Sequence, residues 1–123
     1  MSIARKIFRA AWYQHGLRHR MTGPAIIKTG DTAGTMWFQN DELHRSGDLP
    51  AVTRDGNTFW YNRGNLHRDN DLPAIIWGDA CREWYQNGGL HRIGAPALIW
   101  GNGTEYWYEN NIRYYPEHQI AKN

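Results

Sequence analysis

The sequence is poor in features that define several common protein classes. Cys81 is the single cysteine of the 123 residues, so no internal disulfide can form, and a reducing compartment is expected. No apolar run approaches the ~20 residues of a membrane span, and residues 1–11 lack the apolar stretch of a secretory signal. These absences predict a cytoplasmic protein with no membrane partner.

The net charge is also small. The formal net charge is +2, which supplies little of the attraction to phosphates on which nucleic-acid binding depends. Direct binding of nucleic acid is therefore disfavoured. The cations are unusual in kind, because eleven of the 14 Lys and Arg residues are Arg. Arg makes stacked and bidentate contacts, which predicts either cover for aromatic rings or contact with anionic groups.

Catalytic motifs are missing as well. Ser2 and Ser46 are the only serines, and neither has the G-x-S-x-G context of a nucleophile elbow. No phosphate-binding G-x-G-x-x-G or G-x-x-x-x-G-K-[ST] loop occurs. Cys81 has no base nearby in the sequence. The sequence therefore predicts a non-enzymatic protein with no catalytic residue and no cofactor.

What the sequence does have is a repeat. Trp occurs at positions 12, 37, 60, 84 and 107, at intervals of 25, 23, 24 and 23 residues. In the first four copies Tyr or Phe follows the Trp directly, and a His-Arg pair follows seven and eight places after it. A Pro-Ala pair comes next in each copy. The His-Arg pairs are His19-Arg20, His44-Arg45, His67-Arg68 and His91-Arg92, and the Pro-Ala pairs are Pro24-Ala25, Pro50-Ala51, Pro73-Ala74 and Pro96-Ala97.

One unit divides into short strands. Asn87-Gly88, typical of a two-residue hairpin turn, separates residues 83–86 from residues 90–92. Pro96 opens a further strand, a position where a sheet tolerates proline, and residues 101–103 turn the chain back. The sequence predicts an all-β repeat protein, an elongated antiparallel meander of about ten strands in about five stacked hairpin units of roughly 24 residues. The single twisted sheet is expected to be open or partly coiled.

The array is expected to span residues 12–116. Its end units are atypical, as is common in repeat proteins whose ends face water. Residues 1–11 are expected to form an N-terminal cap, and residues 117–123 a frayed tail.

The units resemble MORN-type repeats, in the variant form W-Y-x-N-G-x-L-H-R-x-D-G-P-A that is frequent in bacteriophage and giant-virus proteins. The resemblance covers residues 12–116 and is most specific in the third and fourth copies, residues 60–74 and 84–97. It is looser where Asn40-Asp41 and His15-Gly16 replace Asn-Gly. It implies a single-layered sheet that serves as a binding platform, no catalytic residues, and a viral origin. For a phage protein the compartment would be the cytoplasm of the bacterial host.

The aromatic residues predict two different faces, because alternate residues of a strand share a face. The Trp row, closed by Ile26, Val52, Ile75 and Leu98, is predicted to form the core. The aromatic residues that follow each Trp would then lie half exposed on the opposite face. Exposed aromatic rows often mark interaction surfaces. We therefore predict binding residues at Phe38, Tyr61 and Tyr85.

The repeated His and Arg residues, here called the His column and the Arg column, have two possible interpretations. Each His is expected to donate a hydrogen bond that holds a turn, and each Arg to pair with a nearby acid among Asp48, Asp69, Asp71 and Glu83. The alternative is ligand contact by His44, His67, His91, Arg45, Arg68 and Arg92. Metal binding is disfavoured, because equivalent residues two strands apart are separated by roughly 9.5 Å, whereas Zn–N bonds are about 2.0–2.1 Å.

Two functional hypotheses follow from these patterns. The favoured one is a protein-binding module, a small phage protein that occludes a host or viral protein, for instance one of a bacterial defence system. The alternative is a sponge for small anionic ligands such as signalling nucleotides, bound by the His, Arg and aromatic columns. The two edge strands of a meander expose unpaired backbone groups, so a homodimer is a further possibility.

Overall fold

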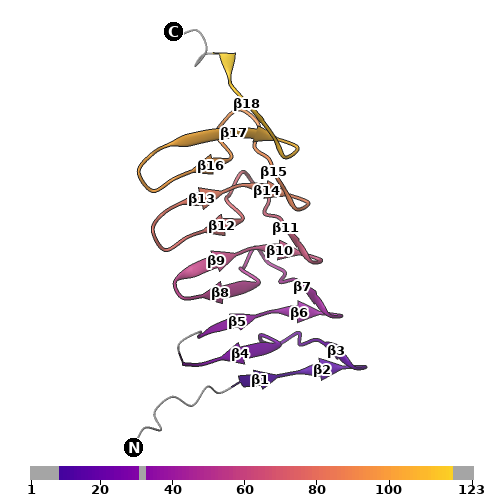
Figure 1. Ribbon diagram of the computed structural model, residues 1–123. Helices are drawn as coiled ribbons and strands as arrows, with labels where there is room; N and C mark the ends of the chain where they lie inside the picture. Colours follow the sequence, from indigo (N-terminus) through magenta and orange to yellow (C-terminus); the bar gives the residue numbers. More distant parts are fainter. Residues whose placement is uncertain (1–8, 31–32, 118–123) are drawn as a thin grey trace, which may run out of the picture.

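The computed structural model describes residues 9–30 and 33–117. It is a ladder of short strands (Figure 1). The strands are β1 (Arg9–Ala11), β2 (Tyr13–Gln14), β3 (Leu17–Arg18), β4 (Ile26–Lys28), β5 (Gly34–Met36), β6 (Phe38–Gln39), β7 (Glu42–Leu43), β8 (Val52–Arg54), β9 (Asn57–Phe59), β10 (Tyr61–Asn62), β11 (Asn65–Leu66), β12 (Ile75–Ile76), β13 (Arg82–Glu83), β14 (Tyr85–Gln86), β15 (Gly89–Leu90), β16 (Leu98–Ile99), β17 (Glu105–Glu109) and β18 (Ile112–Tyr114).

Ten of these strands form one antiparallel sheet in the order β1-β4-β5-β8-β9-β12-β13-β16-β17-β18. The other eight form four hairpins, β2-β3, β6-β7, β10-β11 and β14-β15, which lie along one side of the ladder in Figure 1. The fifth unit ends in the β17-β18 pair. The predicted all-β array of stacked hairpins is confirmed, and the sheet does not close into a barrel.

The hairpins are closed by turns of one type. Asn87 and Gly88 have φ angles of 49° and 87°, both positive as a type I′ turn requires. The same pair of positive φ angles occurs at His15-Gly16, Asn40-Asp41, Arg63-Gly64 and Asn110-Asn111. The four copies whose turn sequence departs from Asn-Gly therefore still form the same turn.

Each repeated Trp is the junction between the large sheet and a hairpin. The N–H of Trp37 donates to the carbonyl of Ala51 at 2.7 Å, and its carbonyl accepts from the N–H of His44 at 3.0 Å. Trp12, Trp60 and Trp84 make the same two bonds with their own Ala and His. Trp, His and Pro-Ala recur together in the sequence because they are three parts of this junction.

Successive hairpins are joined to one another through their turns. The N–H of Asp41 donates to the carbonyl of Arg18 at 2.9 Å, and the N–H of Gly64 donates to that of Leu43 at 2.8 Å. Gly88 and Asn111 repeat this contact with Leu66 and Leu90. Each unit thus rests on the unit before it, as in other linear repeat proteins.

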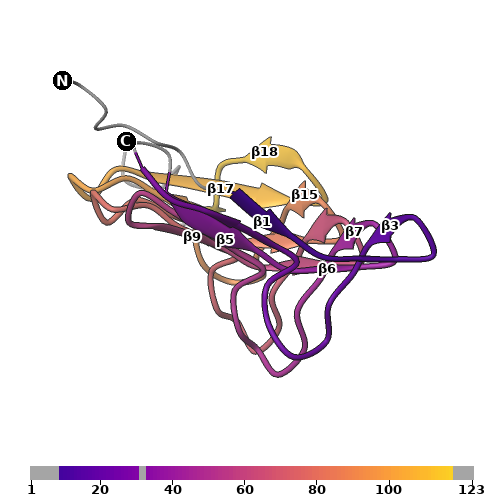
Figure 2. The same ribbon diagram turned by 90° about the horizontal axis from the view of Figure 1, so that it is seen from below.

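The two faces of the sheet differ in what covers them. We call the side of Met36, Phe38, Tyr61 and Tyr85 the aromatic face, and the side of the repeated Trp residues the loop face. Trp37 lies between Met36 and Phe38, so its side chain projects to the opposite side. Seen along the ladder in Figure 2, the loops that carry the Pro-Ala pairs fold to one side of the sheet.

The predicted Trp core holds for three of its five members, because Trp12 is 36% exposed and Trp37 is half-buried, and the predicted apolar partners lie elsewhere. Trp60, Trp84 and Trp107 are only 9%, 5% and 9% exposed. Met36 pairs with Val52, so Trp37 lies opposite Ala51, and the alanine occupies the Trp side. Because side chains alternate along a strand, the residue that follows each of the repeated alanines points to the side opposite the Trp. Ile26, Val52 and Ile75 are buried instead on the aromatic face, as is Phe38 at 4% exposure, which contradicts its predicted half-exposed position.

The ends of the array are less regular. Arg9–Ala11, part of the predicted cap, form strand β1 and pair with β4 at the edge of the large sheet. Residues 1–8 and 118–123, which hold the rest of the predicted cap and nearly all of the predicted tail, lie outside the described residues. In the last unit β17 runs through Trp107, and Tyr114-Tyr115 replace the His-Arg pair.

Candidate functional site

On the loop face each repeated arginine lies flat on the tryptophan of its own unit. The guanidinium carbon of Arg68 is 3.8 Å from the centre of the Trp60 ring, and its Nη1 donates to the carbonyl of Pro73 at 3.2 Å. The stack and the proline contact recur for Arg20, Arg45 and Arg92. A cation–π contact and a charged hydrogen bond therefore fasten each loop beneath the sheet.

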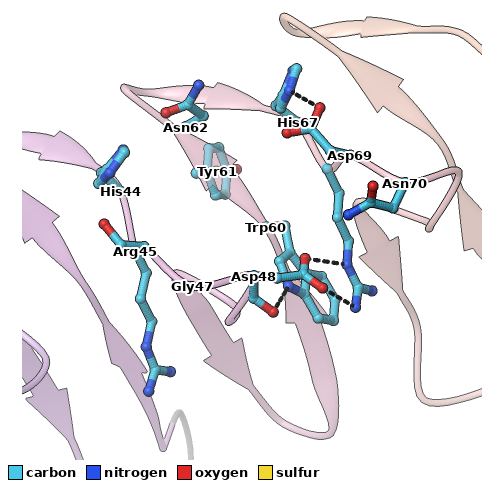
Figure 3. Close-up of a pocket in the computed structure, with 12 residues that line it drawn as sticks. His44, Arg45, Gly47, Asp48, Trp60, Tyr61, Asn62, His67, Asp69 and Asn70 are labelled. Atoms are coloured by element: carbon cyan, nitrogen blue, oxygen red, sulfur yellow. Dashed lines mark hydrogen bonds and ion pairs between the residues drawn. The ribbon is translucent and has the colours of Figure 1, made fainter.

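Two of these arginines also bind a carboxylate of the preceding unit. Arg68 Nε and Nη2 donate to the two oxygens of Asp48 at 2.9 and 3.4 Å, and these two bonds are among the dashed lines that end at Asp48 in Figure 3. Arg92 holds Asp71 in the same way at 2.8 and 3.2 Å. The Arg68 and Arg92 side chains are only 13% and 17% exposed. The expected pairing with acids is present for these two arginines, and their side chains are largely buried by it.

Asp69 and Glu83, the other two acids near the Arg column, have different partners. Asp69 lies 2.9 Å from Nε2 of His67, and Glu83 accepts hydrogen bonds on the aromatic face.

The His column joins each hairpin to the next. Nδ1 of His67 accepts the N–H of Asn87 at 3.1 Å, and His19, His44 and His91 accept the N–H of Asn40, Arg63 and Asn110. Each His holds a turn, as expected, but the turn N–H donates to the ring, and only His67, whose Nε2 lies beside the Asp69 carboxylate, also has the expected acceptor among the described residues. An Nδ1 that accepts leaves the proton of the neutral ring on Nε2. No group of three potential metal ligands occurs in residues 9–30 and 33–117.

A polar cleft of about 240 Å³ lies between the second and third units (Figure 3). Its lining includes His44, Arg45, Asp48, His67 and Arg68. This is the kind of pocket in which the sponge hypothesis places an anion. His67 and Arg68 already have Asp69 and Asp48 as partners, so neither of these two side chains is open to an anionic ligand in this cleft.

The aromatic face carries a groove between the large sheet and the hairpins. Its volume is about 340 Å³, and Phe59 and Trp77 meet in it edge to face, with ring centres 5.4 Å apart. The lining residues are Met36, Leu43, Val52, Phe59, Tyr61 and Trp77, with Arg54, Asp55 and Asn57 beside them. Of the residues predicted for binding, only Tyr61 lines this groove.

Tyr61 and Tyr85 are partly buried on this face, and Tyr85 acts as a hydrogen-bond donor. The hydroxyl of Tyr85 donates to Oε1 of Glu83 at 2.8 Å, and the indole N–H of Trp77 donates to the other oxygen of Glu83. Burial raises the pKa of Tyr61, and burial followed by the neighbouring Glu83 raises the pKa of Tyr85. Both phenols therefore remain protonated at neutral pH.

Sequence reasoning did not single out Phe59 or Trp77. The signal for Phe59 was available, because it lies two residues before Tyr61 and alternate residues share a face. Trp77 and Trp100 are themselves 23 residues apart, and they were overlooked because the larger Trp column dominates the pattern.

Comparison with protein-family models, with curated proteins and with solved structures finds no match for this chain. In the described part of the chain, no helix is long and apolar enough to cross a membrane.

Proposed function

We propose that this chain is a non-enzymatic protein-binding module that holds its partner against the aromatic face. The observation that carries the proposal is the groove lined by Tyr61, Phe59 and Trp77. Tyr and Trp are enriched at protein interfaces and dominate their binding energy. Here Phe59 and Tyr61 stand on paired strands and Trp77 directly follows one, so little ordering is needed on association, and the entropic cost of binding is small.

The resemblance to MORN-type repeats supports a more specific proposal. A small phage protein built as a platform would occlude a host or viral protein by covering part of its surface. A protein of a bacterial defence system would suit this role in the host cytoplasm. The same groove could pair two copies of the chain in a homodimer, which the experiment below separates from binding of another protein.

The direct test is photocrosslinking from inside the groove. A photoreactive phenylalanine analogue replaces Tyr61, and the protein is irradiated in a lysate of a bacterial host. The matched control carries the analogue at Ile93, which is 75% exposed on a loop of the opposite face. We expect one protein adduct from position 61 and none from position 93. Equal adducts from both positions, or none from position 61, would refute the proposal, and a crosslinked dimer of the chain would assign the groove to self-association.

Substitution then checks that the groove binds rather than supports the fold. Tyr61→Ser should abolish formation of the complex with the identified protein while leaving the far-UV circular dichroism of the folded chain unchanged, since Tyr61 is only half-buried. Arg68 is unsuitable for this purpose, because it stacks on Trp60 and pairs with Asp48. Binding that survives Tyr61→Ser would place the contact elsewhere on the protein.

A further inference from the structure

The Arg–Asp pairs follow a rule that links adjacent units. The carboxylate comes from the loop between the Arg and the Pro of one unit, and it binds the arginine of the next. Asp48 of the second unit binds Arg68 of the third, and Asp71 of the third unit binds Arg92 of the fourth. An arginine of this column is thus paired only if the preceding loop supplies an acid.

The two ends of the array depart from this rule in different ways. The loop of the fourth unit, residues 93–95, has no acid, and the fifth unit has Tyr115 in place of the arginine. Both members of the pair are absent there. The loop of the first unit, residues 21–23, also lacks an acid and is one residue shorter than the next loop, yet the second unit retains Arg45. Among the described residues no carboxylate pairs with Arg45.

Arg45 is nevertheless held like its paired counterparts. Its guanidinium carbon is 3.8 Å from the centre of the Trp37 ring, and its Nη1 donates to the carbonyl of Pro50 at 3.2 Å. Arg68 makes these two contacts at the same two distances. The edge of the guanidinium formed by Nε and Nη2, which in Arg68 holds a carboxylate, is therefore preorganised in Arg45 for the same bidentate contact.

Arg45 is also partly desolvated. Burial lowers the pKa of its guanidinium, so the protein bears the cost of removing water from a cation without a carboxylate to offset it. The space beside it is a shallow pocket of about 260 Å³ lined by Met21, Trp37, Gln39, Arg45, Ser46 and Leu49. Met21 and Leu49 are 63% and 47% exposed. An anion at Arg45 would thus lie between two exposed apolar side chains.

We propose that Arg45 is a docking site for a carboxylate of another protein, an aspartate or glutamate side chain with apolar neighbours, which takes the place that Asp48 occupies on Arg68. The apolar neighbours would contact Met21 and Leu49. This site lies on the loop face, opposite the groove. The proposal for Arg45 can therefore be tested independently of the function proposed above.

The test uses arginine Nε–Hε signals in NMR spectra of the full chain. The probe is the blocked tripeptide acetyl-Leu-Asp-Leu-amide, and the control probe is acetyl-Leu-Asn-Leu-amide. We expect the Asp peptide to shift the Arg45 signal saturably, and the Arg68 and Arg92 signals to stay unmoved because their carboxylate positions are filled. The Asn peptide should bind roughly tenfold more weakly, since it cannot make the charge-assisted contact. Acetate, which has no apolar neighbours, should also bind more weakly than the Asp peptide.

A variant of the chain supplies a filled control site. Replacing residues 21–23 by Ser-Gly-Asp-Leu, the loop of the second unit, offers Arg45 an internal carboxylate. We expect its Arg45 signal to move toward those of Arg68 and Arg92 and to lose its response to the peptide. The proposal is overturned if Arg45 does not respond to the Asp peptide, if the Asn peptide or acetate acts equally, or if all three arginines respond alike.

Discussion

Replacing Arg68 by methionine tests whether the arginine column belongs to the fold. Arg68→Met keeps an unbranched chain over Trp60 and removes the guanidinium. The lost cation–π contact is worth about 1–2 kcal/mol when partly desolvated. The charged hydrogen bond to Pro73 contributes about 1.5 kcal/mol. The Asp48 pair adds no more than about 1 kcal/mol, because the aspartate is 46% exposed.

Methionine recovers part of this loss, because its thioether packs well on an aromatic ring. We therefore expect Arg68→Met to lower the free energy of unfolding by about 2–3 kcal/mol, a large share of the 5–15 kcal/mol typical of a domain. Urea unfolding followed by Trp fluorescence and far-UV circular dichroism should show a midpoint lowered by roughly 1–2 M. Coincident transitions by the two probes are needed, since repeat arrays can unfold in parts.

Arg45→Met is the matched control, because Arg45 makes the same stack and proline contact without an aspartate. Its cost should be smaller by the contribution of the carboxylate, up to about 1 kcal/mol. If Arg68→Met left the free energy of unfolding within about 0.5 kcal/mol of the unsubstituted protein, the arginine would not support the fold. It would then have to be regarded again as a residue available to a ligand.

Three further predictions concern single positions. Ala80 has a φ of 76° in a turn where the next unit has Gly103 at 92°. Ala80→Gly should therefore raise the free energy of unfolding by about 1 kcal/mol, and Gly103→Ala should lower it by a similar amount. Urea titration measures both changes. Shifts of the same sign would exclude backbone strain as the cause. His67→Ala removes the acceptor for the N–H of the following turn and should cost about 1 kcal/mol, with faster hydrogen exchange at that amide; unchanged exchange would show that the bond contributes nothing. The hydrogen bond from Arg92 lowers the pKa of Asp71, so its stabilisation is present above the ordinary carboxyl range and is lost as the pH falls through the folded value. Asp71→Asn should therefore flatten the decline of stability between pH 5 and 3, by no more than about 1 kcal/mol for this exposed carboxylate, and an unchanged decline would contradict the assignment.

The local features of the fold could be predicted from the sequence because they depend on neighbouring residues. The turn at Asn87-Gly88 follows from the tolerance of these residues for positive φ. The strand that begins after Pro96 follows from the preference of proline for the start of a strand. The 23–25-residue spacing of Trp then gives the stacking order.

The features that were missed depend on contacts between units. Which face Val52 takes is decided by the register that places Ala51 opposite Trp37, and no local pattern fixes that register. The direction of the His67 hydrogen bond depends on the turn of the following unit. The favoured pairing of arginines with acids was predictable in kind, but the offset of one unit between Asp48 and Arg68 was not.

Because each aspartate of these pairs binds the arginine of the following unit, the array can be lengthened by inserting a copy of an interior unit. A unit copied from residues 60–83 and inserted after Glu83 would offer its own copy of Asp71 to Arg92, and its copy of Arg68 would receive the original Asp71. Every new arginine would find a carboxylate, so gene duplication could extend the ladder from within without leaving an unpaired cation. A copy of the first unit placed in the same position would leave Arg92 without its acid, because its loop has none. The interior of the ladder is thus suited to growth by duplication.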